Sequence, residues 1–342
     1  MSDPADGEPD RTPTPVPQSD GRVRAVSAER VAPIAVADRD GVVESVHHGV
    51  AAVVGPEGDV VVAVGDPETE IYPRSSLKPF QVAAMVEAGL ELPEPLLALA
   101  AASHSGERRH LDGVVEILDR YGLGVEALAN TPARPYGAAA RAAAREAGVE
   151  PSRLQQNCSG KHAAMLATCV VNGWSLDDYL ALEHPVQRAI VETVERIGGR
   201  VAHVGVDGCG APTHVMRVVD AARAIGTLAR NRSSVTTAMS ANPLMVGGTG
   251  RDVSVWMEAV PGLVAKEGAA GVMVMAVPDG TAVAFKVADG SDAARQVVTV
   301  EALRHLGVDV DGELSDTAER VAVPVLGHGD VVGRLSALPW RP

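Results

Sequence analysis

The sequence predicts an α+β fold in which an antiparallel sheet is covered by layers of helices. Two β-hairpins, one near each end of the chain, carry this prediction. Residues 44–66 turn at residues 55–59, and residues 271–290 turn at Asp279-Gly280. Between them lie alanine-rich segments with the periodicity of helices. Strands at both ends with helices between them favour a sheet completed late, rather than the strand–helix alternation of a doubly wound parallel sheet.

The individual elements follow from local signals. Pro324 inside the strand expected at 321–326 indicates an edge of the sheet, because proline cannot donate a ladder hydrogen bond. A further strand is expected at 201–206. Helices are expected at 75–89, 94–102, 110–121, 138–146, 161–171, 185–197, 214–225 and 292–306. Residues 1–25, rich in Pro and Asp, are expected to be a disordered tail before a single catalytic domain at 26–342.

Composition excludes several classes of protein. The chain has 342 residues, 46% hydrophobic and 22% charged, which is ordinary for a globular protein. A net charge of −14 disfavours nucleic acid and anionic membranes as partners. No apolar stretch reaches the length of a membrane span, and the acidic start is unlike a secretory signal. Cytoplasmic localisation is therefore expected, and three cysteines do not form a disulfide framework.

Lysine is rare in this chain. Only four of the 30 basic residues are lysines: Lys78, Lys161, Lys266 and Lys286. Arginine cannot replace lysine where the group must lose its proton or act as a compact amine. These four positions are therefore candidates for chemistry.

The segment Tyr72–Pro79 contains an S-x-x-K pattern, Ser75 to Lys78. A spacing of three on a helix brings a hydroxyl and an amine to one face, where a neutral lysine could activate the serine as a nucleophile. Pro79 fits the first turn of a helix and so places the pair at its start. The pattern is short and common, and a solvated helix start is the alternative.

Two further segments combine glycine with cysteine. Asn157–His162 opens an apolar helix, where the Gly160 amide could bind an anion, although a simple helix cap by Ser159 is the alternative. Asp207–Pro212 is expected to form a tight loop around Cys209. Cys158 and Cys209 could ligate zinc together, but no C-x-x-C pair supports this.

Two polar segments complete the set. Ser103–Glu107 follows an alanine-rich helix, and Lys266-Glu267-Gly268 precedes the second hairpin. A serine nucleophile, a later serine and a K-x-G segment occur here in the same order as in serine β-lactamases and penicillin-binding proteins. The S-D-N string of those enzymes is absent. Gly247–Gly250 lacks the lysine of a P-loop, so no nucleotide or organic cofactor is expected.

Five segments in order resemble the asparaginase II family, the Rhizobium-type L-asparaginases. They are YPRSSLKPFQ, SHSGE, NCSGKHAAML, VDGCGAPT and KEGAAGV. The resemblance implies a fold similar to serine β-lactamases and glutaminases and the hydrolysis of L-asparagine to L-aspartate and ammonia. It also implies an amino acid as the small-molecule substrate, and a homodimer.

The same resemblance assigns roles to residues. One catalytic pair would be Ser75 and Lys78, and a second would join Lys266 to either Ser103 or Ser105. The zinc ligands would be Cys158, Lys161 and Cys209. The candidates for substrate binding are Arg74, Glu107, Gly160 and Asp207. Another serine amidohydrolase, such as a glutaminase or a β-lactam-acylated enzyme, is an alternative, as is a non-catalytic amino-acid sensor.

Overall fold

The computed structural model describes residues 23–341, so most of the expected tail at 1–25 lies outside the described residues. The main sheet is antiparallel throughout and has eight strands. In spatial order seven of them are β10 (Val323–Gly327), β11 (Asp330–Ala337), β1 (Ala32–Arg39), β2 (Val42–Val54), β9 (Ala282–Val287), β8 (Val272–Ala276) and β7 (Val264–Gly268). The eighth, β3 (Val60–Val64), pairs with β2.

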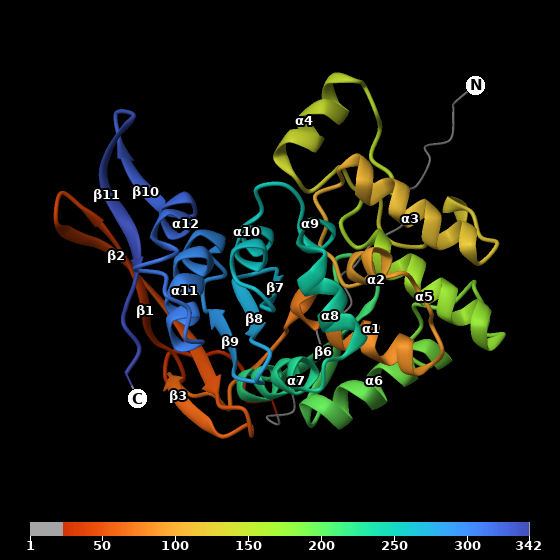
Figure 1. Cartoon of the computed structure of the whole chain (residues 1–342), viewed down its shortest axis with the longest axis horizontal. Coiled ribbons are helices and arrows are strands. Elements are labelled where there is room, and N and C mark those ends of the chain that lie inside the picture. Colours follow the sequence, from red (N-terminus) through yellow and green to blue (C-terminus); the bar gives the residue numbers. More distant parts are fainter. Residues whose placement is uncertain (1–22, 342) are drawn as a thin grey trace, which may run out of the picture.

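The sheet joins distant parts of the chain, as expected from the two hairpins. Strand β2 of the first hairpin pairs with β9 of the second, with Ala52 opposite Ala284. Every residue of β8 is buried, which requires cover on both faces of the sheet. Helix α7 (Val218–Arg230) and helix α11 (Asp292–His305) supply it. Figure 1 shows both helices against the sheet, which confirms the α+β prediction.

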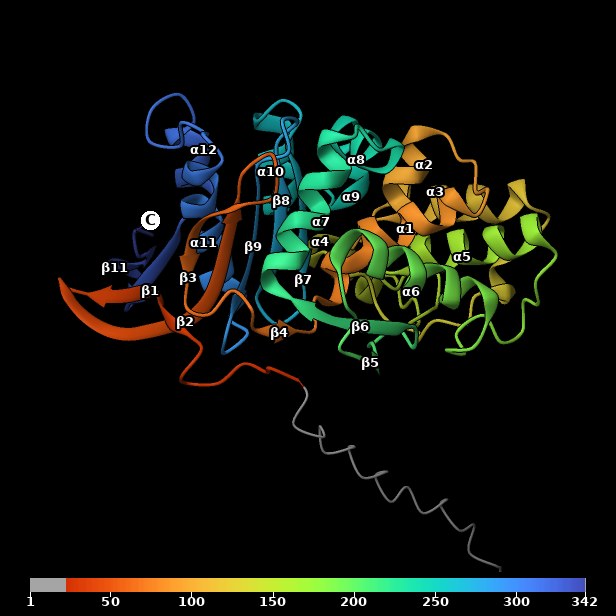
Figure 2. The same ribbon diagram turned by 90° about the horizontal axis from the view of Figure 1, so that it is seen from below.

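A second group of helices lies beside the sheet, on the right in Figure 1 and in Figure 2. These and the smaller helices have the following bounds: η1 Arg74–Leu77, α1 Lys78–Glu87, α2 Glu94–Ala100, α3 Arg108–Arg120, η2 Val125–Ala127, α4 Ala138–Glu146, α5 Ser159–Asn172, α6 Pro185–Gly198, α8 Ser234–Ala241, α9 Pro243–Val246, α10 Asp252–Ala259 and α12 Ser315–Arg320. One connected apolar core includes residues from this group and from the sheet.

One predicted helix is wrong in its first turn. Residues 212–217 form strand β6 (Pro212–Arg217), which pairs with β5 (His203–Val206) and with β4 (Glu70–Ile71) in a separate three-stranded sheet. The helix begins only at Val218. The first five residues of β6 are all buried. A strand that is buried on both faces lacks the alternation of apolar and polar residues that would distinguish it from a buried helix in the sequence.

Several elements fall where the sequence places them. The chain between Lys78 and Glu87 is helical, with Pro79 in its first turn, and Gly89 follows it with a φ of +92°. Strand β10 with Pro324 is the outermost strand at its end of the sheet, which confirms the expected edge position. None of the helices within residues 23–341 is both long and apolar enough to cross a membrane.

Candidate active site

Three of the four lysines are completely or almost completely buried. Lys78 and Lys266 have no exposed surface, and Lys161 has 2%. Lys286, the fourth, is only half-buried and donates to the carbonyl oxygens of Ala270 and Val287. A buried ammonium group is costly unless it has charged or hydrogen-bonding partners, so the partners of the three buried lysines define the site.

Lys78 and Lys266 meet at one hydroxyl group. Lys266 Nζ lies 2.9 Å from Ser103 Oγ, and Lys78 Nζ lies 3.2 Å from the same atom. Lys78 Nζ also donates to the carbonyl oxygen of Ala102. We call Lys78, Ser103 and Lys266 the Ser–Lys cluster. It joins helix α1, the segment after helix α2, and strand β7, which are far apart in the sequence.

The backbone of the second predicted segment explains which serine enters this cluster. The N–H groups of Ser103 and Ser105 donate to the carbonyl oxygens of Val246 and Gly247, whereas the N–H of His104 donates to Asn157. The segment is therefore extended and held from two sides. Ser105 Oγ donates to the Gly247 carbonyl at 2.9 Å, away from the lysines. Of the two serines left open by the sequence, the structure brings Ser103 to Lys266.

The histidine between these serines anchors the segment to helix α5. His104 accepts a hydrogen bond from the Gly106 N–H at Nδ1, so Nε2 carries the proton and faces Ser159 Oγ at 2.9 Å. Burial, followed by the charges of His110 and Lys78, keeps the pKa of His104 well below its usual value. A neutral His104 therefore positions the backbone beside the Ser–Lys cluster.

Ser75 lies in η1, the short turn that directly precedes helix α1 and Lys78, and is half-buried. Within residues 23–341 no hydrogen bond joins its hydroxyl to Lys78, whose amine points to Ala102 and Ser103. The preceding residue, Arg74, has a φ of +55°, a conformation that a residue with a side chain adopts only when its surroundings enforce it. Arg74 Nε donates to Asp207 Oδ1 at 2.7 Å. This ion pair holds the turn that presents Ser75.

Strand β7 packs directly against that turn. A Cβ atom on Gly268 would lie 2.2 Å from the carbonyl oxygen of Pro73, closer than any side chain can approach. The glycine of the K-x-G segment is therefore required by the contact between β7 and η1. The same contact places Lys266, two residues earlier on β7, near the start of helix α1.

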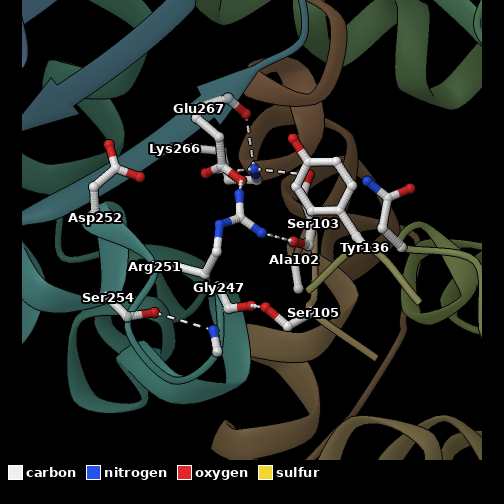
Figure 3. A network of polar contacts seen from close by, with 12 residues as sticks. Ala102, Ser103, Ser105, Tyr136, Gly247, Arg251, Asp252, Ser254, Lys266 and Glu267 are labelled. Carbon is white, nitrogen blue, oxygen red and sulfur yellow. Dashed lines mark hydrogen bonds and ion pairs between the residues drawn. The ribbon is translucent and has the colours of Figure 1, made fainter. Parts of the chain in front are cut away.

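Glu267 and Arg251 surround Lys266, as Figure 3 shows. Glu267 Oε2 lies 3.0 Å from Lys266 Nζ, and Glu267 Oε1 accepts a hydrogen bond from Arg251 at 2.9 Å. Arg251 also donates to the Ser103 carbonyl at 3.3 Å and stacks over the Tyr136 ring at 4.5 Å. The sequence analysis missed Arg251 and Tyr136, because no local pattern connects them to Lys266.

The charges around Lys266 act in opposite directions on its proton. Burial is the largest influence and, with the nearby Lys78, lowers the pKa of Lys266 to about 8, while Glu267 acts to raise it. Burial also opposes ionisation of Glu267, but Lys266 and Arg251 outweigh it and lower the pKa of Glu267 to about 2. At neutral pH this site therefore contains a fixed carboxylate and an amine close to its titration point.

The third buried lysine lies in a different environment. Lys161 Nζ donates to Cys209 Sγ at 3.3 Å, and the Cys158 thiol, which donates to Asn157 Oδ1 at 3.4 Å, is the other close neighbour of Cys209. We call Cys158, Lys161 and Cys209 the Cys–Lys cluster. The neighbouring Cys158 thiol, reinforced by Lys161, lowers the pKa of Cys209 to about 5, and the proximity of Cys209 together with burial raises the pKa of Cys158 to about 12.

The donor set of this cluster fits a zinc ion. Zinc is bound by thiolate sulfur and by neutral nitrogen, and the lowered pKa of Cys209 favours its thiolate form. Within residues 23–341 no three His, Cys, Asp or Glu side chains form a metal-binding group, and the nitrogen donor beside the two cysteines is the Lys161 amine. Metal binding then has to displace the protons of Cys158 and Lys161.

The predicted substrate-binding residues are not all in one place. Asp207 lies in the loop beside Cys209, and although burial acts against ionisation, Lys161 and Arg74 lower the pKa of Asp207. Glu107 begins helix α3 and accepts hydrogen bonds from the N–H and hydroxyl of Thr249. Gly160 lies in the first turn of helix α5, where a Cβ would be 2.4 Å from the Leu99 carbonyl, so close helix packing explains this glycine.

Comparison with known proteins identifies the class of this fold and site. The family model of L-asparaginase II matches residues 35–337, almost the whole described chain. A match of this extent supports an amidohydrolase, an enzyme that cleaves amide bonds with water. The chain belongs to the L-asparaginase II family, which confirms the resemblance carried by its five segments.

Other comparisons add little. A search of curated proteins found no match. Among solved structures, a β-lactamase from Mycobacterium bovis is similar, with 15% sequence identity and a TM-score of 0.33. The similarity covers 79% of this chain and 95% of the β-lactamase chain. At this TM-score nothing about the site follows from the similarity.

Proposed function

We propose that the protein is an L-asparaginase that hydrolyses L-asparagine to L-aspartate and ammonia. One observation carries the proposal: in a chain of the L-asparaginase II family, two buried lysine amines lie within hydrogen-bond distance of one serine hydroxyl, Ser103 Oγ. An amine that can lose its proton beside a serine is the arrangement that activates a hydroxyl without histidine.

Ser75 is the proposed nucleophile, because this residue is only half-buried whereas Ser103 is 3% exposed. Lys78 accepts the Ser75 proton, Ser75 Oγ bonds to the side-chain amide carbon, and ammonia leaves with one proton as the carbon–nitrogen bond breaks. Water then cleaves the ester and restores Ser75. Ser103 and Lys266 exchange protons with Lys78 during both halves of the reaction.

The ion pair of Arg74 and Asp207 is the proposed partner of the α-carboxylate and α-ammonium groups of the substrate. Arg74 directly precedes Ser75, and Asp207 is bonded to Arg74. Beyond this bond, Arg74 has further N–H donors and Asp207 has further acceptor positions. Glu107, already bonded to Thr249, and the Gly160 amide are weaker candidates for the same task.

A second candidate for the nucleophile is Ser103 itself, favoured by its two lysine contacts. Ammonia release from L-asparagine by the wild type, Ser75→Ala and Ser103→Ala distinguishes the two, with L-glutamine and a chromogenic β-lactam in parallel. Loss of all turnover in Ser75→Ala with a burst of product in Ser103→Ala supports Ser75. Turnover that survives Ser75→Ala transfers the role to Ser103, and the absence of turnover on any substrate favours a sensor.

We further propose that Cys158, Lys161 and Cys209 hold one zinc ion per chain. When bound, zinc supplies a positive charge that can bind a substrate group and neutralise the two thiolates. Lys161 lies on helix α5, Cys158 directly precedes this helix, and Cys209 lies in the loop after β5. The fold of the chain therefore fixes the three ligands. Zinc should raise the melting temperature of the wild type by several degrees but not that of Cys158→Ala.

A homodimer in the cytoplasm is part of the same proposal. Light scattering of the purified protein tests the dimer, and a mass of about 35 kDa, that of one chain, contradicts it.

A further inference from the structure

We propose that Glu267, held in place by Arg251, is a positioning residue that orients the Lys266 amine on Ser103. The proposal deepens the proposed function and rests on it, because it concerns how one lysine of the Ser–Lys cluster is controlled. Its argument is the geometry of strand β7 and of the loop before helix α10, together with the chemistry of the groups that meet there.

Strand β7 lies at the end of the sheet path and packs against η1, the turn that leads into helix α1 and Lys78. Side chains of adjacent residues normally leave opposite faces of a strand. Here Lys266 and Glu267 nevertheless meet, because Lys266 Nζ donates to the Glu267 carbonyl oxygen at 2.8 Å and lies 3.0 Å from Glu267 Oε2. The Lys266 amine is therefore held by a hydrogen bond to the backbone carbonyl of Glu267 and by an ion pair with its carboxylate.

Arg251 links this carboxylate to the serine. Its guanidinium donates to Glu267 Oε1 and to the Ser103 carbonyl, while the Tyr136 ring covers it on one side (Figure 3). A planar guanidinium can hold two acceptors at fixed separation, which a lysine amine cannot do. Arg251 therefore sets the distance between Glu267 and the backbone of Ser103, and hence between Lys266 Nζ and Ser103 Oγ.

The buried charge at this place has no other evident structural purpose. Glu267 is 5% exposed and carries its charge among Lys266, Arg251 and Arg295, but Arg295 is already paired with Asp252 at 2.6 Å. Lys78 on helix α1 is the other charged group that faces Lys266. Without Glu267, Lys266 would be surrounded by the positive charges of Lys78 and Arg251 alone.

The consequence is a testable effect on the proton of Lys266. Glu267 favours the ammonium form, so its neutralisation should make Lys266 lose its proton at lower pH. If neutral Lys266 is the working form, the acidic limb of the pH profile of kcat/KM moves to lower pH in Glu267→Gln. Loss of orientation should lower kcat by about tenfold with KM changed by less than about twofold.

The experiment uses the scarcity of lysine. Protein labelled with [13Cε]lysine has four lysine side-chain resonances, one from each lysine, and Lys266→Arg assigns one of them. In Glu267→Gln we expect this resonance to titrate at least about one pH unit lower than in the wild type. Glu301→Gln is the matched control, because Glu301 is also a buried glutamate paired with an arginine, Arg304 at 2.8 Å, but lies on helix α11.

An unchanged Lys266 titration in folded Glu267→Gln, with kcat equal to that of Glu301→Gln, overturns the proposal. If Glu267→Gln does not fold, Arg251→Lys replaces it: a smaller shift in the same direction supports the proposal, and no shift overturns it. Absence of asparagine turnover in the wild type contradicts the proposed function, whereas the lysine titration still decides the role of Glu267.

Discussion

The Ser–Lys cluster and the Cys–Lys cluster both contain buried lysines, but the pKa values of Lys266 and Lys161 are shifted in opposite directions. Burial lowers the pKa of Lys266 to about 8, because the one neighbouring carboxylate is outweighed by burial and by Lys78. Lys161 is buried to a similar degree, yet the sulfur of Cys209, with Cys158 and Asp207, holds its pKa above the usual value. The neighbouring charge, rather than burial, decides which lysine can accept a proton near neutral pH.

Among the lysine variants, the largest expected effect concerns the Lys266 amine of the Ser–Lys cluster. Lys266→Met removes the group that contacts Ser103 and should lower kcat/KM for L-asparagine by about 10³-fold, within the range of general acid–base catalysis. Lys286→Met is the control, since this lysine bonds only carbonyl oxygens outside the cluster, and it should retain activity within about twofold. Equal losses in both variants would show that lysine removal acts through stability, which melting curves measure.

The next prediction separates the two serines of one segment. Ser103→Ala removes the hydroxyl between Lys78 and Lys266 and should lower kcat by about 10²-fold. Ser105→Ala removes only a hydrogen bond to the Gly247 carbonyl and should cost about 1 kcal/mol of stability with activity within about fivefold. A larger loss of kcat in Ser105→Ala than in Ser103→Ala would reverse the assignment.

The Cys–Lys cluster should be visible in the pH dependence of stability. The pKa of Cys209 is lowered from 9.0 to about 5, so the folded state binds fewer protons than the unfolded state between these values. In metal-free protein the free energy of unfolding should therefore fall as pH decreases from 9 to 5, by about 1 kcal/mol per pH unit.

Urea unfolding of the wild type and Cys209→Ser measures this slope. The interval from pH 5.5 to 7.5 isolates it from Lys266, whose own lowered pKa makes stability rise with pH only above about 8. Identical slopes in the two proteins would mean that Cys209 remains a thiol in the folded state.

The smallest effect is expected from removing the N-terminal segment. Deletion of residues 1–22 should leave activity within about twofold. Extending the deletion through residue 25 also removes Arg24, whose carbonyl accepts a hydrogen bond from Glu70 at 2.8 Å and whose side chain pairs with Asp66. The additional loss should be about 1 kcal/mol in the free energy of unfolding, measured with urea. A large loss of activity on removing residues 1–22 would place that segment at the site or at a dimer contact.

Local patterns predicted much of the fold. The turn at Asp279-Gly280 and the apolar runs on either side of it indicated strands β8 and β9, and alanine-rich periodicity indicated most helices close to their observed bounds. The sequence analysis does not predict strand β7, which contains the charged residues Lys266 and Glu267. It predicts a helix from residue 214, although residues 214–217 belong to strand β6. Burial depends on what packs against a segment, which no local window contains.

The sequence by itself determined the family, the order of its motifs and the unusual lysines, because these are properties of residue type and spacing. Only the tertiary structure decided that Ser103 rather than Ser105 meets Lys266, and that Arg251 and Tyr136 belong beside it. Those contacts join residues more than 100 positions apart, and side-chain orientation in the extended segment 103–105 is set by the loop at 246–247 that it bonds. Proton affinity follows from such contacts, so it too is a property of the folded chain alone.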